Sequence, residues 1–238
     1  MFTPALTRTC LALGVLGAGL AVALATSSPQ AAIAEDAPAY ADPAAEAMNQ
    51  IAPATFDAVF TVGNGDQSAT FVIRTRRDWA PLGADRFYNL VKSGYFDDQR
   101  IFRVVPDFVA QFGIHGDPDV SANWRSARIE DDPIRPDVSN TRGRVVFANA
   151  GPNTRTTQLF INFGNNAFLD DPRQMRGSVF APFGEVIQGM DVVDAINAEY
   201  GERPNQGAIQ TQGNAYLDGS FPNLTQIVSA TIVEPDAE

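Results

Sequence analysis

The sequence has very little cysteine, histidine or lysine, and each shortage excludes a class of site. A single cysteine, Cys10, excludes a disulfide framework within the chain. One cysteine and one histidine, His115, cannot supply the several Cys or His ligands of a zinc site. A Ser-His-Asp triad would rest on His115 alone. Lys92 is the sole lysine among 17 basic residues, so a buried or catalytic cation is expected to be an arginine.

Positive charge as a whole is scarce. The formal net charge of the 238 residues is −11 at pH 7. A surface that follows phosphates needs clustered Lys and Arg, so we predict no nucleic-acid partner. Hydrophobic residues make up 45% of the chain. This length and composition allow one large domain or two small ones, with a sizeable core.

Residues 1–34 have the pattern of a signal peptide. Arg8 precedes an unbroken run of apolar and glycine residues at 11–25, which is shorter than the about 20 residues of a membrane-spanning helix. An Ala-Ile-Ala sequence ending at residue 34 then matches the small-x-small pattern of a cleavage site. We therefore expect an exported protein, periplasmic or secreted, that starts at Glu35 and has no stable membrane association after cleavage. An uncleaved N-terminal anchor is the alternative.

Residues 35–55 are rich in alanine, proline and acidic side chains. Such a composition buries little apolar surface, so we expect a tether or a loosely packed lead-in, with a short helix at 44–51 as an option. The folded domain is predicted over residues 56–238.

From residue 56 on, the pattern predicts a mainly β domain. Phe56, Ala58, Phe60 and Val62 alternate with other positions, as in a strand with one buried face. Further strands are predicted at 70–75, 101–105, 108–113, 144–149, 158–162, 183–187 and 224–233. Two helices are predicted, one from Pro81 to Ser93 and one at 190–197, and residues 114–141 are expected to form a loop. About eight short strands without regular βαβ alternation favour an antiparallel barrel or sandwich.

Three sequence blocks carry a resemblance to a known family. They are IFRVVPDFVAQ at 101–111, FANAGPNT at 147–154 followed by QLFI at 158–161, and FLD at 168–170 followed by VFAPFGEV at 179–186. In order and spacing, these blocks resemble those of the cyclophilin-type peptidyl-prolyl cis-trans isomerases, nearest to the short bacterial exported kind. The resemblance covers residues 56–235. It implies a single domain built as an eight-stranded closed antiparallel β-barrel capped by two α-helices.

The resemblance also implies an activity, the rotation of X–Pro peptide bonds in unfolded or extended polypeptides. This rotation has a barrier of about 18–20 kcal/mol because the amide must lose its resonance. It needs no nucleophile, metal or cofactor. The twisted prolyl nitrogen regains a lone pair that can accept a hydrogen bond, and a donor aligned only in that state accelerates the reaction. Arg103 stands where the family places this donor.

The remaining site residues follow from the same resemblance. Gln111 would hydrogen-bond the substrate backbone and help to position Arg103, and Asn149 would offer backbone groups to the peptide; these three residues form the predicted catalytic set. The predicted substrate-binding residues are Phe108, Val109, Ala148, Ala150, Gln158, Phe160, Phe168, Leu169 and Phe180. The chain departs from the family pattern at Phe102, Phe112, Thr156 and Leu159.

Other interpretations compete with this one. Arg103 could be a solvated charge on an edge strand, and Phe108 and Phe160 could be plain core residues. His115 is expected to be a loop residue without a catalytic role. The protein could also be a module that binds Pro-containing segments without turnover, or a hydrolase on a β-barrel, although no plausible triad supports the latter. A monomer is the default, and the sequence specifies neither the client proteins nor the preferred residue before proline.

Overall fold

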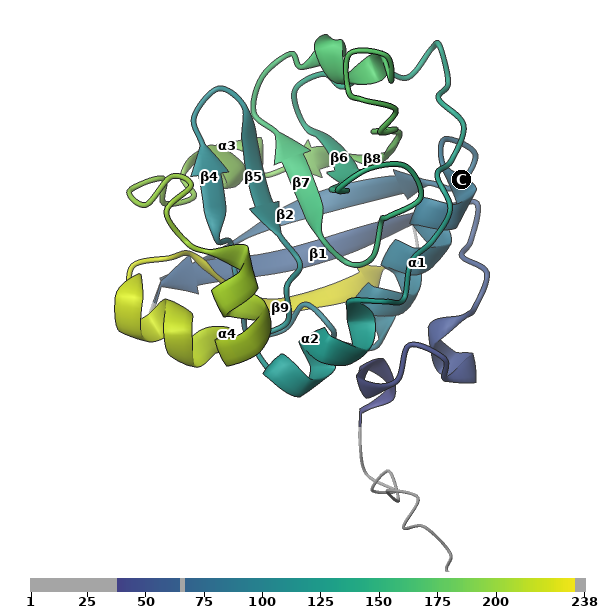
Figure 1. The fold of residues 1–238 in the computed structure, drawn as a ribbon. Coiled ribbons are helices and arrows are strands. Elements are labelled where there is room, and N and C mark those ends of the chain that lie inside the picture. The colour runs from purple at the N-terminus through teal and green to yellow at the C-terminus, as the bar shows by residue number, and fades with distance from the viewer. Residues whose placement is uncertain (1–37, 65–66, 234–238) are drawn as a thin grey trace, which may run out of the picture. The chain divides into compact units, whose positions relative to one another are not determined.

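The computed structural model describes residues 38–64 and 67–233, which form a mainly β structure with several helices (Figure 1). The strands are β1 (Thr55–Asn64), β2 (Gln67–Arg76), β3 (Gln99–Arg100), β4 (Arg103–Val105), β5 (Val109–Phe112), β6 (Arg144–Phe147), β7 (Leu159–Asn162), β8 (Pro182–Gln188) and β9 (Gln226–Val233). The helices are α1 (Pro81–Lys92), α2 (Pro118–Trp124), α3 (Met190–Asp194) and α4 (Gln206–Ser220), with short 3-10 helices η1 (Ala39–Ala41), η2 (Glu46–Met48) and η3 (Ala167–Asp170). The predicted signal peptide lies outside the described residues.

All nine strands belong to one antiparallel sheet, in the order β3-β9-β1-β2-β8-β6-β7-β5-β4. The sheet curls into a half-barrel (Figure 1). The closed eight-stranded barrel is not confirmed, because the described residues form nine strands and no ladder joins β3 to β4. Of the strand predicted at 101–105, only residues 103–105 form a strand, β4, and an additional short strand, β3, precedes it at 99–100. β3 pairs with β9, whereas β4 pairs with β5, and the chain crosses the gap between them at Ile101 and Phe102.

Two of the four α-helices were predicted and two were not. Pro81 begins α1, and Gly94, at a φ of 78°, follows its end, as the sequence pattern indicates. α3 begins at Met190, also as predicted, but ends at Asp194. α2 lies within the expected loop at 114–141, and α4 lies in a segment without a helical hydrophobic stripe.

The strands nearest the N-terminus are buried on the face that their alternation predicts. Phe56, Ala58 and Phe60 are fully buried, and the ring of Phe60 stacks on that of Phe71 across the β1–β2 hairpin, with centroids 5.2 Å apart. The same ring stacks on Phe87 of α1. Burial of each such side chain stabilises the fold by about 1.5–3 kcal/mol, so Phe87, together with the buried Leu90 and Val91, holds α1 against the sheet.

The lead-in packs more closely than its composition indicates. From residue 38 on it lies against the rest of the domain, with Met48 and Ala52 buried. The indole Nε1 of Trp124 donates to the carbonyl of Tyr40 at 2.7 Å. The Ala52 N–H donates to the Asp85 carboxylate at 2.9 Å. Within the helix expected at 44–51, only the turn of η2 is present.

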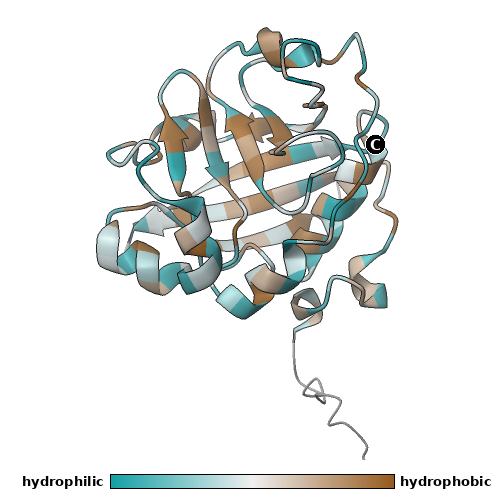
Figure 2. Cartoon of the chain, viewed as in Figure 1, coloured by the Kyte–Doolittle hydropathy of each residue, from teal (hydrophilic) through white to brown (hydrophobic). Residues whose placement is uncertain are grey.

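The β5, β6 and β7 strands are buried on both faces, which creates a second apolar layer outside the main core. Strand side chains alternate between faces. Ala110, Phe112, Leu159 and Ile161 belong to the main core, whereas apolar side chains on the opposite face belong to a separate cluster. That cluster contains Val109, Val146, Phe160 and Leu169. Hydrophobic residues therefore gather along these strands in Figure 2, and the second cluster forms the base of the site described next.

In the described ranges, none of the helices is both long and apolar enough to cross a bilayer.

Candidate active site

A row of side chains crosses four neighbouring strands on the outer face of the sheet. Arg103 on β4 is the register partner of Gln111 on β5, which in turn faces Phe160 on β7. Phe160 is the partner of Val146 on β6. Because cross-strand partners lie side by side, a cation, an amide and two apolar side chains follow one another in a line. The row is thus charged at one end and apolar at the other.

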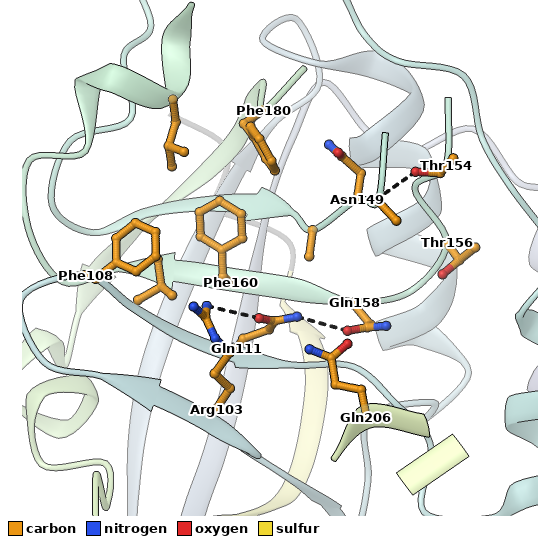
Figure 3. Close-up of a pocket in the computed structure, with 14 residues that line it drawn as sticks. Arg103, Phe108, Gln111, Asn149, Thr154, Thr156, Gln158, Phe160, Phe180 and Gln206 are labelled. Carbon is orange, nitrogen blue, oxygen red and sulfur yellow. Dashed lines mark hydrogen bonds between the residues drawn. The ribbon is translucent and has the colours of Figure 1, made fainter. Parts of the chain in front are cut away.

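Arg103, Gln111 and Phe160 of this row line a cavity of about 380 Å³ (Figure 3). All predicted site residues except Phe168 line it. The lining consists of Arg103, Phe108, Val109, Gln111, Ala148, Asn149, Ala150, Thr154, Thr156, Gln158, Phe160, Leu169, Phe180 and Gln206. The three sequence blocks, far apart in the chain, therefore meet in one cavity.

The apolar end of the cavity is a compact seat. Val109, Phe160 and Leu169 are almost fully buried, and Phe108 and Phe180 pack against them from the rim. The Phe180 ring meets that of Phe160 edge to face, with centroids 6.0 Å apart. A small apolar ring placed here would be surrounded by aromatic and aliphatic carbon.

The polar end is a chain of hydrogen bonds. Nη1 of Arg103 donates to Oε1 of Gln111 at 3.3 Å, and Nε2 of Gln111 donates to Oε1 of Gln158 at 3.0 Å (Figure 3). The guanidinium carbon of Arg103 also lies 5.6 Å from the ring centroid of Phe108. The side chain of Arg103 is only 24% exposed. Arg103 is thus held at the cavity and is not a solvated edge charge.

The loop that follows β6 forms the opposite wall. Nδ2 of Asn149 donates to the Val179 carbonyl at 2.9 Å, and its Oδ1 accepts from the Gly151 N–H at 3.3 Å. The Asn149 side chain is therefore committed to holding the loop. Oγ1 of Thr154 accepts from the Ala150 N–H at 2.9 Å and closes the turn.

A buried ion pair anchors this wall from behind. Nη1 of Arg155 lies 2.9 Å from Oδ2 of Asp132, and the two side chains are 2% and 0% exposed. The Asp132 carboxylate also accepts from the N–H groups of Leu82 and Gly83 in the first turn of α1, at 2.9 Å each. Nη2 of Arg155 donates to the Glu130 carbonyl. The loop is thereby tied to α1 and to the segment before residue 133.

One predicted residue lies outside the cavity and several lining residues were not predicted. Phe168 is 46% exposed and stacks on Phe108 instead, because it precedes Leu169 on the short turn of η3 and so points in another direction. Thr154 and Thr156 lie within or next to the second sequence block, which could have indicated them. Gln206 comes from α4, which none of the blocks includes, and carries no such signal.

His115 does not line the cavity. It is 9% exposed and lies between the rings of Tyr40 and Tyr95, at 5.1 and 5.2 Å. Its Nδ1 accepts from the Asp117 N–H at 3.0 Å. Burial lowers the pKa of His115 below its ordinary value of 6.5, although the nearby carboxylate of Asp117 opposes that change. The neutral ring is a packed part of the structure behind the site.

Comparison with known proteins places the chain in a family. Residues 60–214, more than half of the chain, match the family model described as cyclophilin type peptidyl-prolyl cis-trans isomerase/CLD. The chain is 36% identical over 118 residues to a peptidyl-prolyl cis-trans isomerase of Acinetobacter baylyi, covering 49% of this chain and 61% of that protein. It is 33% identical over 140 residues to peptidyl-prolyl cis-trans isomerase ppi1 of Schizosaccharomyces pombe, covering 56% and 84%. It is also 31% identical over 139 residues to peptidyl-prolyl cis-trans isomerase B of Escherichia coli, covering 58% and 81%.

The chain therefore belongs to the cyclophilin-type peptidyl-prolyl cis-trans isomerase family, which is a family of enzymes. The match spans less than two thirds of the length of the Acinetobacter relative.

Proposed function

We propose that this protein rotates X–Pro peptide bonds in extended or unfolded polypeptides, acts as a monomer, and assists the folding of exported proteins. The observation that carries the proposal is the row on the outer face of the sheet, in which Arg103 stands at the edge of an apolar seat centred on Phe160. Family membership supports the same activity.

The apolar seat and the loop wall would bind the substrate. The proline ring would enter between Phe160, Leu169 and Phe108, which fixes one side of the bond. The chain before the proline would extend along Ala148 and Ala150, whose small side chains leave room for a backbone. Gln111 is hydrogen-bonded on both sides, so its amide is oriented before a peptide arrives.

Catalysis then needs one well-placed donor. As the amide twists, its nitrogen loses resonance and gains a lone pair, and an N–H of Arg103 can donate to it. Because this hydrogen bond exists only in the twisted state, it lowers the barrier and does not merely tighten binding. Each 1.4 kcal/mol gained in this way is about tenfold in rate. The scheme uses no proton transfer and no covalent intermediate.

A peptide isomerisation assay with the full chain tests the proposal. Uncatalysed X–Pro exchange takes on the order of tens to hundreds of seconds, and we expect catalytic amounts of the protein to shorten it. Binding of the peptide without acceleration would favour the module that only holds Pro-containing segments. Peptide cleavage or a covalent product would favour a hydrolase.

The proposed role in export rests on the sequence of residues 1–34 and on the slowness of prolyl isomerisation, which can limit folding. Mass spectrometry of the protein from its native host tests it. We expect a mature chain that starts at Glu35. An intact chain beginning at Met1 would contradict cleavage.

A further inference from the structure

The connection between α3 and α4 passes directly beside Arg103. Oε1 of Glu202, in this connection, accepts from Nε of Arg103 at 2.8 Å and from its Nη2 at 2.5 Å. The preceding residue is also fixed to β4, because the Gly201 carbonyl accepts from the Val104 N–H at 3.2 Å. Glu202 is thus held next to Arg103 by its backbone as well as by its carboxylate.

The guanidinium of Arg103 is restrained mainly from this side. Of its five N–H groups, two donate to Glu202 and one donates to Gln111. The bond to Gln111 is neutral and 3.3 Å long, whereas those to Glu202 are shorter and charge-assisted, which makes them stronger. An arginine side chain has many rotamers, and a carboxylate across the Nε–Nη2 edge restricts them. No other acceptor for Arg103 lies among the side chains that the structure describes at this position.

We propose that Glu202 is a positioning residue, which holds Arg103 in the orientation that directs its remaining N–H groups into the cavity. The inference rests on the proposed donor role of Arg103. It makes the α3–α4 connection part of the catalytic apparatus, although Glu202 itself does not line the cavity. The carboxylate is 64% exposed, so its role is to orient its partner and not to support the core.

Substitution of Glu202 tests the proposal with a matched control. We expect Glu202→Ala to lower kcat about fivefold and to change KM little. A fivefold fall corresponds to the free energy that a well-formed exposed ion pair contributes. Glu202→Gln keeps an acceptor oxygen at the same reach and should restore most of the loss. Asp218→Ala is the control, because Asp218 also joins this part of the chain to an arginine, Arg100 on β3, and is similarly exposed at 56%. We expect its kcat to equal that of the wild type.

A double-mutant cycle separates positioning from a general structural effect. In the Arg103→Ala background, Glu202→Ala should cause no further loss. An NMR spectrum of arginine side chains gives a second readout, since Nε–H of Arg103 should exchange faster with water in Glu202→Ala than in the wild type. Equal losses in both backgrounds, or wild-type kcat in a folded Glu202→Ala protein, would overturn the proposal while leaving the donor role of Arg103 intact. Full activity of Arg103→Ala would instead remove that donor role, and the positioning role with it.

Discussion

Arg155 and Arg103 both contact carboxylates, yet their surroundings give them opposite tasks. Arg155 and its partner Asp132 are 2% and 0% exposed, and their hydrogen bonds run to the loops and to the start of α1. Arg103 and its partner Glu202 are 24% and 64% exposed, and the guanidinium faces a cavity. A buried cation needs a close carboxylate because its desolvation is costly, whereas a partly exposed one can keep donors for a ligand.

The difference extends to the two regions around these arginines. The Asp132–Arg155 pair and His115 are buried and do not line the cavity, and each bonds to its own neighbours or to the backbone; we call these groups together the buried polar region. On the outer face of the sheet, Arg103 and Phe160 contribute to a cavity that is open to a ligand. Substitutions in the buried polar region should therefore change stability and spare turnover, and those in the cavity should do the reverse.

The largest effect is expected from Asp132→Ala. It removes the nearer of the two carboxylates at buried Arg155, leaving Asp131 at 3.5 Å from Nε, and it removes the acceptor for two N–H groups of α1. The free energy of unfolding should therefore fall by about 3–4 kcal/mol, toward the lower end for a broken buried pair. Chemical denaturation measures this fall. The matched control is Asp137→Ala, which breaks the exposed pair with Arg135 and should leave the denaturation midpoint nearly unchanged. A large loss of turnover in folded Asp132→Ala without a loss of stability would contradict the division between the regions.

Arg103→Lys should produce a smaller effect than Asp132→Ala, and on turnover alone. An ammonium keeps the charge but lacks the planar fork that meets Glu202 and Gln111 together. We expect kcat/KM to fall about tenfold, or about 1.4 kcal/mol, with stability near that of the wild type. Steady-state isomerisation kinetics measure the fall. Wild-type kinetics in this variant would mean that charge alone is enough.

His115 should make the stability of the protein depend on mildly acidic pH. Because burial lowers its folded-state pKa below the ordinary value of 6.5, the unfolded chain binds a proton more readily. The stability contributed by the neutral ring is therefore complete above about pH 6.5 and is lost as pH falls below it, before most carboxylates titrate near pH 4. Denaturation curves between those values should show the slope in the wild type.

His115→Asn is the matched variant for this slope. Its Oδ1 can still accept from the Asp117 N–H in a local turn, but it cannot be protonated. We expect the slope to flatten in this variant and turnover to stay near wild type, since the scheme moves no proton. An unchanged slope would assign the pH dependence to other groups.

The smallest effect is expected from Phe168→Ala. The ring is 46% exposed, does not line the cavity and stacks on Phe108 at its rim. We therefore expect kcat/KM within about twofold of the wild type, equivalent to less than about 0.5 kcal/mol. Peptide isomerisation kinetics measure it. A large rise in KM would show that the rim of the cavity extends to Phe168 when a peptide is bound.

Local sequence patterns predicted the elements that have a regular buried face or a clear signal at their start. The alternation at Phe56, Ala58 and Phe60 predicted the buried face of β1, and Pro81 predicted the start of α1. α4 was not predicted, because few of its side chains are buried; among them are Ile209 and Leu217, which lie two turns apart. The helix is also kinked at Gly213, where φ is 59°. The additional strand β3 depends on pairing with β9, far along the chain, and no local pattern contains that information.

In the candidate site too, contacts between segments that are distant in the sequence could not be predicted from local patterns. All but one of the site residues predicted from the sequence blocks line the cavity, because each block keeps its side chains at fixed positions on neighbouring strands and loops. Which of Phe168 and Leu169 enters the cavity depends on the orientation of a single turn. Glu202 and Gln206 reach Arg103 and the cavity only through the path of the chain after α3, about a hundred residues from Arg103 in sequence.

The most direct test of the central claim, that Arg103 supplies the transition-state hydrogen bond, is exchange NMR on an X–Pro peptide with wild type and Arg103→Ala. The method measures the catalysed exchange rate and the peptide affinity together. We predict a fall in catalysed exchange of about a hundredfold, or about 3 kcal/mol, as for loss of one preorganised donor, with affinity nearly unchanged because the apolar seat remains. Near-normal exchange in a folded Arg103→Ala protein would contradict the account.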